Sequence, residues 1–287
     1  MSKTERNSKK RHKKIGVRFS TIIYTLFGIY IIPRGVEAHV ADLVELVRPL
    51  GLSANATRLG LSRMSRHGVF RSRKVGRHSY YSLSKKGMEW MESGRVRAFE
   101  VEHRKWDGRW RFVVYGVPEK LRSLRDKVRG RLDGLGFAPL SASVWISPHD
   151  LRSEIVRFVA QMKMTGYVEM FEAKYTGLRS AKKFANGIWD IDGLERRYRA
   201  FFDKYKNLNA MFERLAKAGT PISPAECFAE RFCMTAEYVA LRLEDPMLPL
   251  DLLPANWIGL RAQRLHDELW ARLKRPANDF VDSVLRK

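Results

Sequence analysis

Cysteine is scarce in this chain, and zinc-binding patterns are absent from it. The 287 residues include two cysteines, Cys227 and Cys233, whose spacing matches no zinc pattern, and no histidine pair lies near them at ligand spacing. Two cysteines in so long a chain fit a reducing compartment, in which small apolar thiols are usually buried. We therefore expect a cytoplasmic protein without a metal site.

The motifs of common enzymes are missing as well. No glycine-rich phosphate loop follows an expected strand, neither H-E-x-x-H nor G-x-S-x-G occurs, and the seven histidines are scattered. Gly134-Leu135-Gly136 marks the end of a helix before a strand, not half of a dinucleotide fingerprint. The sequence therefore predicts no catalytic residues, no cofactor and no enzyme activity.

Long apolar runs are also lacking. The run from Phe19 to Ile32 is too short to span a bilayer, so we expect no membrane partner. It follows a basic stretch, and Val36-Glu37-Ala38 resembles a cleavage site, so a signal peptide is an alternative interpretation. We favour a buried first helix capped by Ser20, because Pro33-Arg34-Gly35 interrupts the end of the run and the chain beyond it is strongly basic.

Acidic residues are few in the first third of the chain. The formal net charge is +23 at pH 7. Residues 1–90 hold 19 Lys and Arg against 5 Asp and Glu, residues 91–187 hold 19 against 11, and residues 188–287 hold 16 against 15. A basic excess concentrated in one segment is the electrostatic footprint expected of a protein that binds nucleic-acid phosphates.

The segment from Ser53 to Leu83 gives that charge a structural context. Ser53 is a suitable N-cap for a helix in which Ala56, Leu59 and Met64 recur at roughly helical spacing, and Gly68 ends this helix. Two strands are expected next, residues 69–73 and 78–83, joined by the basic turn of residues 74–77. The alternative is an exposed helix with a solvated charged face.

The neighbouring segments complete a DNA-binding motif. Residues 39–50 predict a second helix with Val40, Leu43, Val44 and Val47 facing the core, and Pro49 and Gly51 end it. The short turn from there to Ser53 is what a helix-turn-helix needs, and a basic hairpin after the recognition helix is the layout of a winged helix that reads duplex DNA. Residues 84–98 predict one more helix before a linker near His103.

Ten residues of this motif are predicted to contact DNA. Side chains in the groove can discriminate between bases by about 1–3 kcal/mol each, whereas phosphate contacts position the protein without specifying sequence. The groove candidates are Asn55, Thr57, Arg58, Ser62 and Arg63; the phosphate candidates are Arg66 and Arg71; the wing candidates are Lys74, Arg77 and His78. His78 fits ordinary strand packing equally well.

The middle of the chain changes pattern from Trp110 onwards. Strands are expected over residues 111–117, 137–140, 143–146 and 167–174, and helices over residues 121–135 and 150–164. The resulting order β-α-β-β-α-β is that of a ferredoxin-like domain with one open sheet face. Beyond Phe184 the chain is predicted to be helical, over residues 191–205, 209–218, 224–244 and 257–273. The fold class is therefore α+β with several domains.

Several segments together resemble one family, the PaaX-like bacterial repressors of aromatic-acid catabolism. The matching stretches cover roughly residues 19–275 in the family's order, which makes the resemblance more specific than any single motif. They are residues 61–64 (LSRM), 73–81 (RKVGRHSYY), 106–111 (WDGRWR), 189–190 (WD), 198–201 (YRAF), 245–249 (DPMLP) and 252–257 (LLPANW).

The resemblance implies a division of the chain and a function. It implies a winged helix over residues 19–100, a ferredoxin-like dimerisation domain similar to the small CRISPR spacer-acquisition subunit over residues 106–180, and a helical domain over residues 185–287. Residues 1–18 form a basic arm that we expect to be disordered. The implied protein is a homodimeric repressor that binds a palindromic operator and is released by an aryl-CoA thioester such as phenylacetyl-CoA. One departure from the family is Gly60, in the middle of the expected recognition helix, where a better helix former is expected. Glycine at this position costs about 1 kcal/mol relative to alanine.

Two alternatives concern the middle domain and the effector. Ferredoxin-like nucleases place a metal-binding aspartate at the end of the first strand, but Gly116 stands there, and Asp107 and Glu119 lie in flanking loops. We therefore expect a scaffold, not a nuclease. An effector with phosphates and an acyl group needs cations and an apolar slot, for which the candidates are Trp189, Arg196, Arg197, Tyr198 and Arg199. The alternative is that these aromatics are core residues and the arginines a solvated face. A repressor without a small-molecule effector also stays open.

Overall fold

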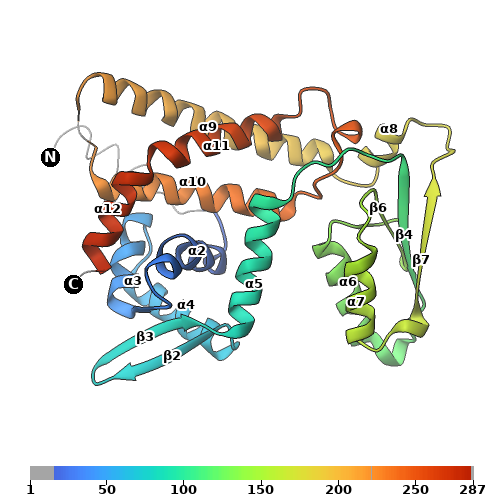
Figure 1. Ribbon diagram of the computed structural model, residues 1–287, viewed down its shortest axis with the longest axis horizontal. Helices are drawn as coiled ribbons and strands as arrows, with labels where there is room; N and C mark the ends of the chain where they lie inside the picture. Colours follow the sequence, from blue (N-terminus) through green and yellow to red (C-terminus); the bar gives the residue numbers. More distant parts are fainter. Residues whose placement is uncertain (1–15, 221, 286–287) are drawn as a thin grey trace. The chain divides into compact units, whose positions relative to one another are not determined.

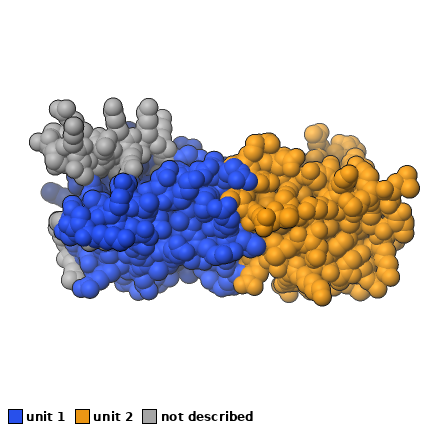
Figure 2. Space-filling model, turned by 90° about the horizontal axis from the view of Figure 1, so that it is seen from above, with its two compact units in different colours: residues 1–100, 198–243, 259–287 blue, residues 101–197, 244–258 orange. Residues whose placement is uncertain are grey.

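The computed structural model describes residues 16–220 and 222–285, which combine α-helices with two antiparallel sheets (Figure 1). The chain forms two compact units (Figure 2). Unit 1 contains the described residues among 1–100, 198–243 and 259–287, and unit 2 contains residues 101–197 and 244–258. Residues 1–15 of the predicted basic arm lie outside the described residues. The α+β fold class is confirmed.

Unit 1 begins with a nearly continuous helical segment and a short strand. The elements are α2 (Phe19–Leu26), η1 (Phe27–Ile31, a π-helix), η2 (Ile32–Arg34), β1 (Glu37–His39), α3 (Val40–Val47) and η3 (Arg48–Leu50). The predicted cap at Ser20 is wrong, since Arg18 occupies the N-cap position without a capping side-chain hydrogen bond. The second helix starts after His39 because that residue pairs with Tyr80 in the sheet.

The next elements of unit 1 follow the predicted order. They are α4 (Ala54–Arg66), β2 (Phe70–Val75), β3 (His78–Leu83), α5 (Lys85–Arg95) and η4 (Val96–Glu100). The sheet has the order β1-β3-β2, with both pairs antiparallel. Gly76 and Arg77 form the two-residue turn between β2 and β3, and the hairpin extends away from the helices of this unit (Figure 1). Gly76 has a φ of +58°, a conformation that glycine adopts without strain.

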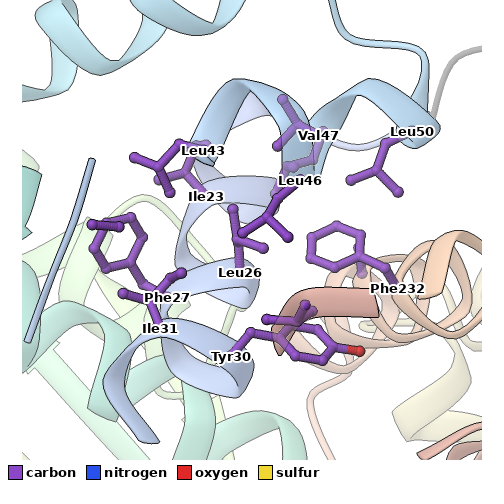
Figure 3. Close-up of a cluster of buried hydrophobic side chains, with 14 of the residues drawn as sticks. Ile23, Leu26, Phe27, Tyr30, Ile31, Leu43, Leu46, Val47, Leu50 and Phe232 are labelled. Atoms are coloured by element: carbon purple, nitrogen blue, oxygen red, sulfur yellow. The ribbon is translucent and has the colours of Figure 1, made fainter. Parts of the chain in front are cut away.

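Helices from the end of the chain complete unit 1. They are the part of α9 (Ile191–Lys217) that follows Arg197, α10 (Pro224–Glu244), α11 (Ile258–Arg272) and α12 (Lys274–Leu285). Phe232 of α10 lies against the apolar side chains of α2, η1 and α3 in one core (Figure 3). Ala277 and Val281 of α12 belong to the same core. The helices of the predicted C-terminal domain thus pack with the predicted DNA-binding segment.

Unit 2 contains the second sheet. Its elements are β4 (Arg109–Tyr115), η5 (Glu119–Leu121), α6 (Arg122–Gly134), β5 (Ala138–Pro139), β6 (Val144–Ser147), α7 (Arg152–Gln161), η6 (Thr165–Tyr167), β7 (Val168–Lys174), α8 (Ala181–Asn186) and η7 (Leu250–Leu252). The strand order is β5-β6-β4-β7, all antiparallel, and the chain order is the predicted β-α-β-β-α-β. Helices α6 and α7 cover one face of this sheet, because Val128 and Ile155 share a core with Val113 and Trp145.

The helical predictions near the end of the chain are partly corrected. Residues 191–205 and 209–218 form one helix, α9, because neither proline nor glycine interrupts the sequence between them. Helix α10 has the predicted bounds, whereas α8 and α12 were not predicted. Within residues 16–220 and 222–285, no helix is both long and apolar enough to cross a membrane.

Candidate nucleic-acid interface

Helix α4 is held in place by its cap and by a narrow buried stripe. The Ser53 hydroxyl oxygen accepts a hydrogen bond from the Ala56 amide at 3.2 Å, as predicted for an N-cap. Thr57, Leu61 and Met64 point into the core at spacings of four and three residues. At the other end, Gly68 has a φ of +73° and Val69 donates to the Met64 carbonyl, so the helix ends in a Schellman motif. The opposite face of α4 is open to solvent.

One predicted groove residue lies on the wrong side of α4. Thr57 is fully buried, and its hydroxyl donates a hydrogen bond to the Ser53 carbonyl at 2.9 Å. It therefore stabilises the first turn of the helix and cannot reach a base. The remaining α4 candidates, Asn55, Arg58, Ser62, Arg63 and Arg66, are all exposed on the outward face.

The apolar spacing of α4 was also misassigned. Ala56 and Leu59 were predicted to face the core with Met64, but both are exposed, and Leu59 retains 59% of its accessible surface. The buried stripe starts at Thr57. Its methyl group is apolar and its hydroxyl is hydrogen-bonded to the Ser53 carbonyl, so its burial leaves no polar group without a partner. Leu59 therefore shares the outward face with the polar candidates.

The hairpin exposes four of the predicted contacts. Arg71, Lys74, Arg77 and His78 are all exposed. Arg73, in the same strand, is different, because its guanidinium makes a two-pronged ion pair with Glu37 of β1 and lies over the ring of Tyr80. The Arg73 guanidinium accordingly lowers the pKa of the Glu37 carboxyl. Arg73 is engaged within the sheet, whereas Arg71 and Lys74 are exposed and form no ion pair within the described residues.

His78 combines strand packing with exposure. Its Nδ1 lies 3.1 Å from Nε2 of His39 in β1, a hydrogen bond between the two rings. His39 in turn stacks at an angle on Tyr80 and lies 3.9 Å from the Asp42 carboxylate. His78 therefore packs across the sheet and remains exposed, and its contact with DNA stays a prediction.

Six exposed cations of α4 and the hairpin lack acidic partners within the described residues. The segment from Ser53 to Leu83 contains no Asp or Glu. No carboxylate within the described parts of the chain forms an ion pair with the six outward cations, which are Arg58, Arg63, Arg66, Arg71, Lys74 and Arg77. Other arginines of the protein do pair, as Arg95 does with Glu92 and Glu100. Six exposed cations without an acidic partner favour a polyanionic partner.

The carboxylates considered for a nuclease are held by arginines. Asp107 makes a two-pronged ion pair with Arg111, which lowers the pKa of the Asp107 carboxyl, and Glu119 accepts from Arg125 Nη1 at 2.8 Å. Gly116 follows β4, and a Cβ added there would meet no atom within 4 Å. Among the residues that the structure describes, no group of three or more His, Cys, Asp or Glu could hold a metal ion.

The predicted effector residues fall in two different environments. Trp189 is 8% exposed in unit 2, where its Nε1 donates to the Gly136 carbonyl at 3.3 Å and its ring stacks on Trp110. Tyr198 is 1% exposed and belongs to unit 1. These two aromatics are therefore core residues, which corrects their assignment to an open slot. Arg196, Arg197 and Arg199 are exposed, and Arg197 lies 3.5 Å from Glu244.

Comparisons with known proteins give a consistent picture along the chain. Three family models match in order: the PaaX-like protein over residues 18–87, the PaaX protein central Cas2-like domain over residues 103–185, and the PaaX-like protein C-terminal domain over residues 189–283. The transcriptional repressor PaaX of Escherichia coli (strain K12) is 26% identical over 270 residues, which cover 93% of this chain and 84% of the relative.

A solved structure has a similar fold. The uncharacterized protein Rv0674 from Mycobacterium tuberculosis matches with a TM-score of 0.56 and 21% sequence identity. The match covers 92% of this chain and 97% of the other. At this level of identity the similarity concerns the fold alone, and it extends over both compact units.

Proposed function

The chain belongs to the PaaX-like family, and on that premise we propose that it is a transcriptional repressor that binds double-stranded DNA. The relative in Escherichia coli is a transcriptional repressor by name, and its similarity extends over nearly the whole chain. The observation that carries the proposal for this chain is the set of six exposed cations on α4 and the hairpin, none of which has an acidic partner among the described residues. A repressor of this kind acts on chromosomal DNA in the cytoplasm.

The proposed binding mode is that of a winged helix-turn-helix. Helix α3, the turn to Ser53 and α4 form the helix-turn-helix, and the β2–β3 hairpin is the wing. Helix α4 enters the major groove, where Asn55, Arg58, Ser62 and Arg63 read base edges, while Arg66 and Arg71 contact phosphates. Lys74, Arg77 and His78 of the wing meet phosphates or the adjacent minor groove.

Dimerisation and release are further parts of the proposal. A palindromic operator requires two copies of α4 one helical turn of DNA apart, and the β-α-β-β-α-β part of unit 2, proposed to be ferredoxin-like, is the proposed dimerisation domain. An aryl-CoA thioester such as phenylacetyl-CoA, bound with help from Arg196, Arg197 and Arg199, is the proposed effector. A tenfold change in operator occupancy requires about 1.4 kcal/mol of coupling free energy, which a small change in dimer geometry can supply.

The test is a band-shift titration of the full-length protein on DNA from upstream of its own gene and on a scrambled duplex. We expect specific binding that Arg58→Ala abolishes, with weak salt-sensitive binding retained. Arg95→Ala is the matched control, because Arg95 is a half-exposed arginine of unit 1 that is paired with acids. Equal affinity of the wild type for both duplexes would overturn the proposal.

The effector is tested in the same assay. Phenylacetyl-CoA and other aryl-CoA thioesters are added to the specific complex, with free coenzyme A and phenylacetate as controls. Release by one thioester supports the effector and identifies its class. Specific binding that no thioester changes would keep the repressor and remove the thioester from the proposal.

A further inference from the structure

Leu59 lies on the outermost line of α4, together with Arg66 two turns later. Successive helical residues are about 100° apart around the axis, which places Leu59 between about 140° and 160° from Thr57, Leu61 and Met64. Those three residues point into the core, so the Leu59 side chain points directly away from it. Its 59% exposure agrees with this position.

The surroundings of Leu59 are polar and cationic. Asn55 lies one turn before it, and Ser62 and Arg63 lie one turn after it, all exposed. In the proposed complex the outermost residues of the recognition helix, Leu59 among them, face the floor of the major groove. An apolar side chain is therefore presented to the base edges between groups that form hydrogen bonds.

The major groove offers one apolar group. Guanine presents N7 and O6, adenine N7 and N6, and cytosine N4, whereas thymine presents a 5-methyl group beside its O4 acceptor. Leucine against a polar edge would leave that edge without water and without a hydrogen-bond partner, which is unfavourable. Leucine against the methyl group buries apolar surface on both sides.

We propose that Leu59 determines specificity by packing on the 5-methyl group of one thymine in each half-site of the DNA. This inference rests on the proposed function and adds a base preference to it. Burial of one methyl group corresponds to about a fourfold gain in affinity, and two half-sites give about fifteenfold.

The experiment isolates the methyl group. Full-length protein is used to select binding sequences from a library of random-sequence DNA duplexes, and the selected duplex is then resynthesised with deoxyuridine replacing each thymidine in turn. Deoxyuridine removes only the 5-methyl group. We expect the wild type to lose about fourfold in affinity at one thymine of a half-site, and Leu59→Ala to bind the thymidine and deoxyuridine duplexes equally at that position.

Two variants serve as controls for this result. Leu59→Ala should fold, because the site is exposed and alanine is the better helix former, while Leu59→Met keeps an apolar contact and should keep the deoxyuridine penalty. Leu140→Ala removes an exposed leucine of unit 2 and should also keep the penalty.

The outcomes separate the two proposals. The inference is overturned if selected sites contain no thymine whose methyl group matters, or if Leu59→Ala shows the same deoxyuridine penalty as the wild type at every thymine. Either result leaves sequence-specific binding, and so the proposed function, in place. A library without any enriched sequence would overturn both.

Discussion

Arg231 of α10 donates a hydrogen bond from Nη1 to the hydroxyl oxygen of Tyr30 in η1, over 2.7 Å. The Arg231 side chain is 2% exposed, its Nε donates to the Trp270 carbonyl at 3.1 Å, and its guanidinium lies 3.4 Å from the centre of the Trp270 ring. Burial lowers the pKa of Arg231, but an arginine stays charged at neutral pH. This cation is stabilised by a hydroxyl, a carbonyl and a ring, and it joins α10 and α11 to the helical segment that precedes α3.

We expect Tyr30→Phe to destabilise the protein, because it leaves an Nη1 donor of a buried cation without a partner. Hydrogen bonds to charged groups are worth about 1.5–3 kcal/mol, and the free energy of unfolding should fall by that amount. Tyr24→Phe is the matched control, because the buried Tyr24 hydroxyl has no hydrogen-bond partner within the described residues. Its loss should not destabilise the protein, because a buried hydroxyl without a partner is itself unfavourable. Urea unfolding followed by circular dichroism measures both, and equal effects would contradict the role of the Arg231 contact.

A pair of glycines in α5 gives a second prediction. A Cβ on Gly87 would lie 2.2 Å from the Val69 carbonyl oxygen, a backbone atom that cannot move aside cheaply, whereas a Cβ on Gly94 would meet nothing closer than 4.0 Å. Gly87→Ala should therefore destabilise unit 1 by about 1–3 kcal/mol despite the better helix propensity of alanine. Gly94→Ala should stabilise it by up to about 1 kcal/mol. Thermal unfolding of the two variants checks the signs, and a stabilised Gly87→Ala would show that α5 and Val69 do not pack this closely.

The local structure of the predicted DNA-binding segment could be predicted because its signals are local. Ser53 and Gly68 mark the ends of α4 by the chemistry of their own side chains and backbone, and the hairpin follows from a glycine turn between two strands. The inward face of α4 was harder to predict. The apolar periodicity placed Leu59 in the core and Thr57 on the surface. Periodicity counts only apolar residues, so it does not reveal that the Thr57 hydroxyl is hydrogen-bonded to a carbonyl one turn earlier and can therefore be buried.

Which segments of the chain come together in unit 1 could not be predicted from the sequence. The apolar periodicity of α10 and α12 shows that each helix buries a face, but not which segment covers it. Phe232 and Val281 pack in one core with residues from the first 70 positions of the chain. Likewise, Trp189 and Tyr198 are close in sequence yet are buried in different units, so their proximity in the sequence did not indicate which core each would join.

Histidine burial makes the stability of unit 1 dependent on pH. Burial lowers the pKa of His266 below its usual value of 6.5, against the opposing effect of the Asp267 carboxylate 2.9 Å from Nδ1. Below pH 6.5 the His266 ring binds a proton in the unfolded chain, whereas the buried ring of the folded protein binds it only at a lower pH. The free energy of unfolding therefore decreases as the pH falls from 6.5 towards the lowered pKa. We expect the melting temperature to be lower at pH 5.5 than at pH 7.5, and to fall less in His266→Phe, which keeps an aromatic ring against Tyr238.

The controls for this prediction separate His266 from other titrating groups. His67→Gln removes an exposed histidine of the same unit and should leave the fall in melting temperature as in the wild type. His149 of unit 2 also has a pKa lowered by burial, so His266→Phe should retain part of the pH dependence. An unchanged fall in His266→Phe would assign the whole effect to groups other than His266.

Two hydroxyl residues of α4 provide the sharpest test of which face of the helix meets DNA. Thr57→Val keeps the buried shape but loses the hydrogen bond to the Ser53 carbonyl, which still accepts from the Thr57 amide at 3.0 Å. We expect it to cost about 1 kcal/mol of stability and to leave the preference between specific and scrambled DNA unchanged. Ser62→Ala should do the reverse, with unaltered stability and an affinity for the specific duplex reduced about fivefold, because one base contact of about 1 kcal/mol is lost. Band shifts and urea unfolding on the same two preparations measure both quantities. If Thr57→Val altered the DNA preference while Ser62→Ala did not, the outward face of α4 would not be the face that reads the bases.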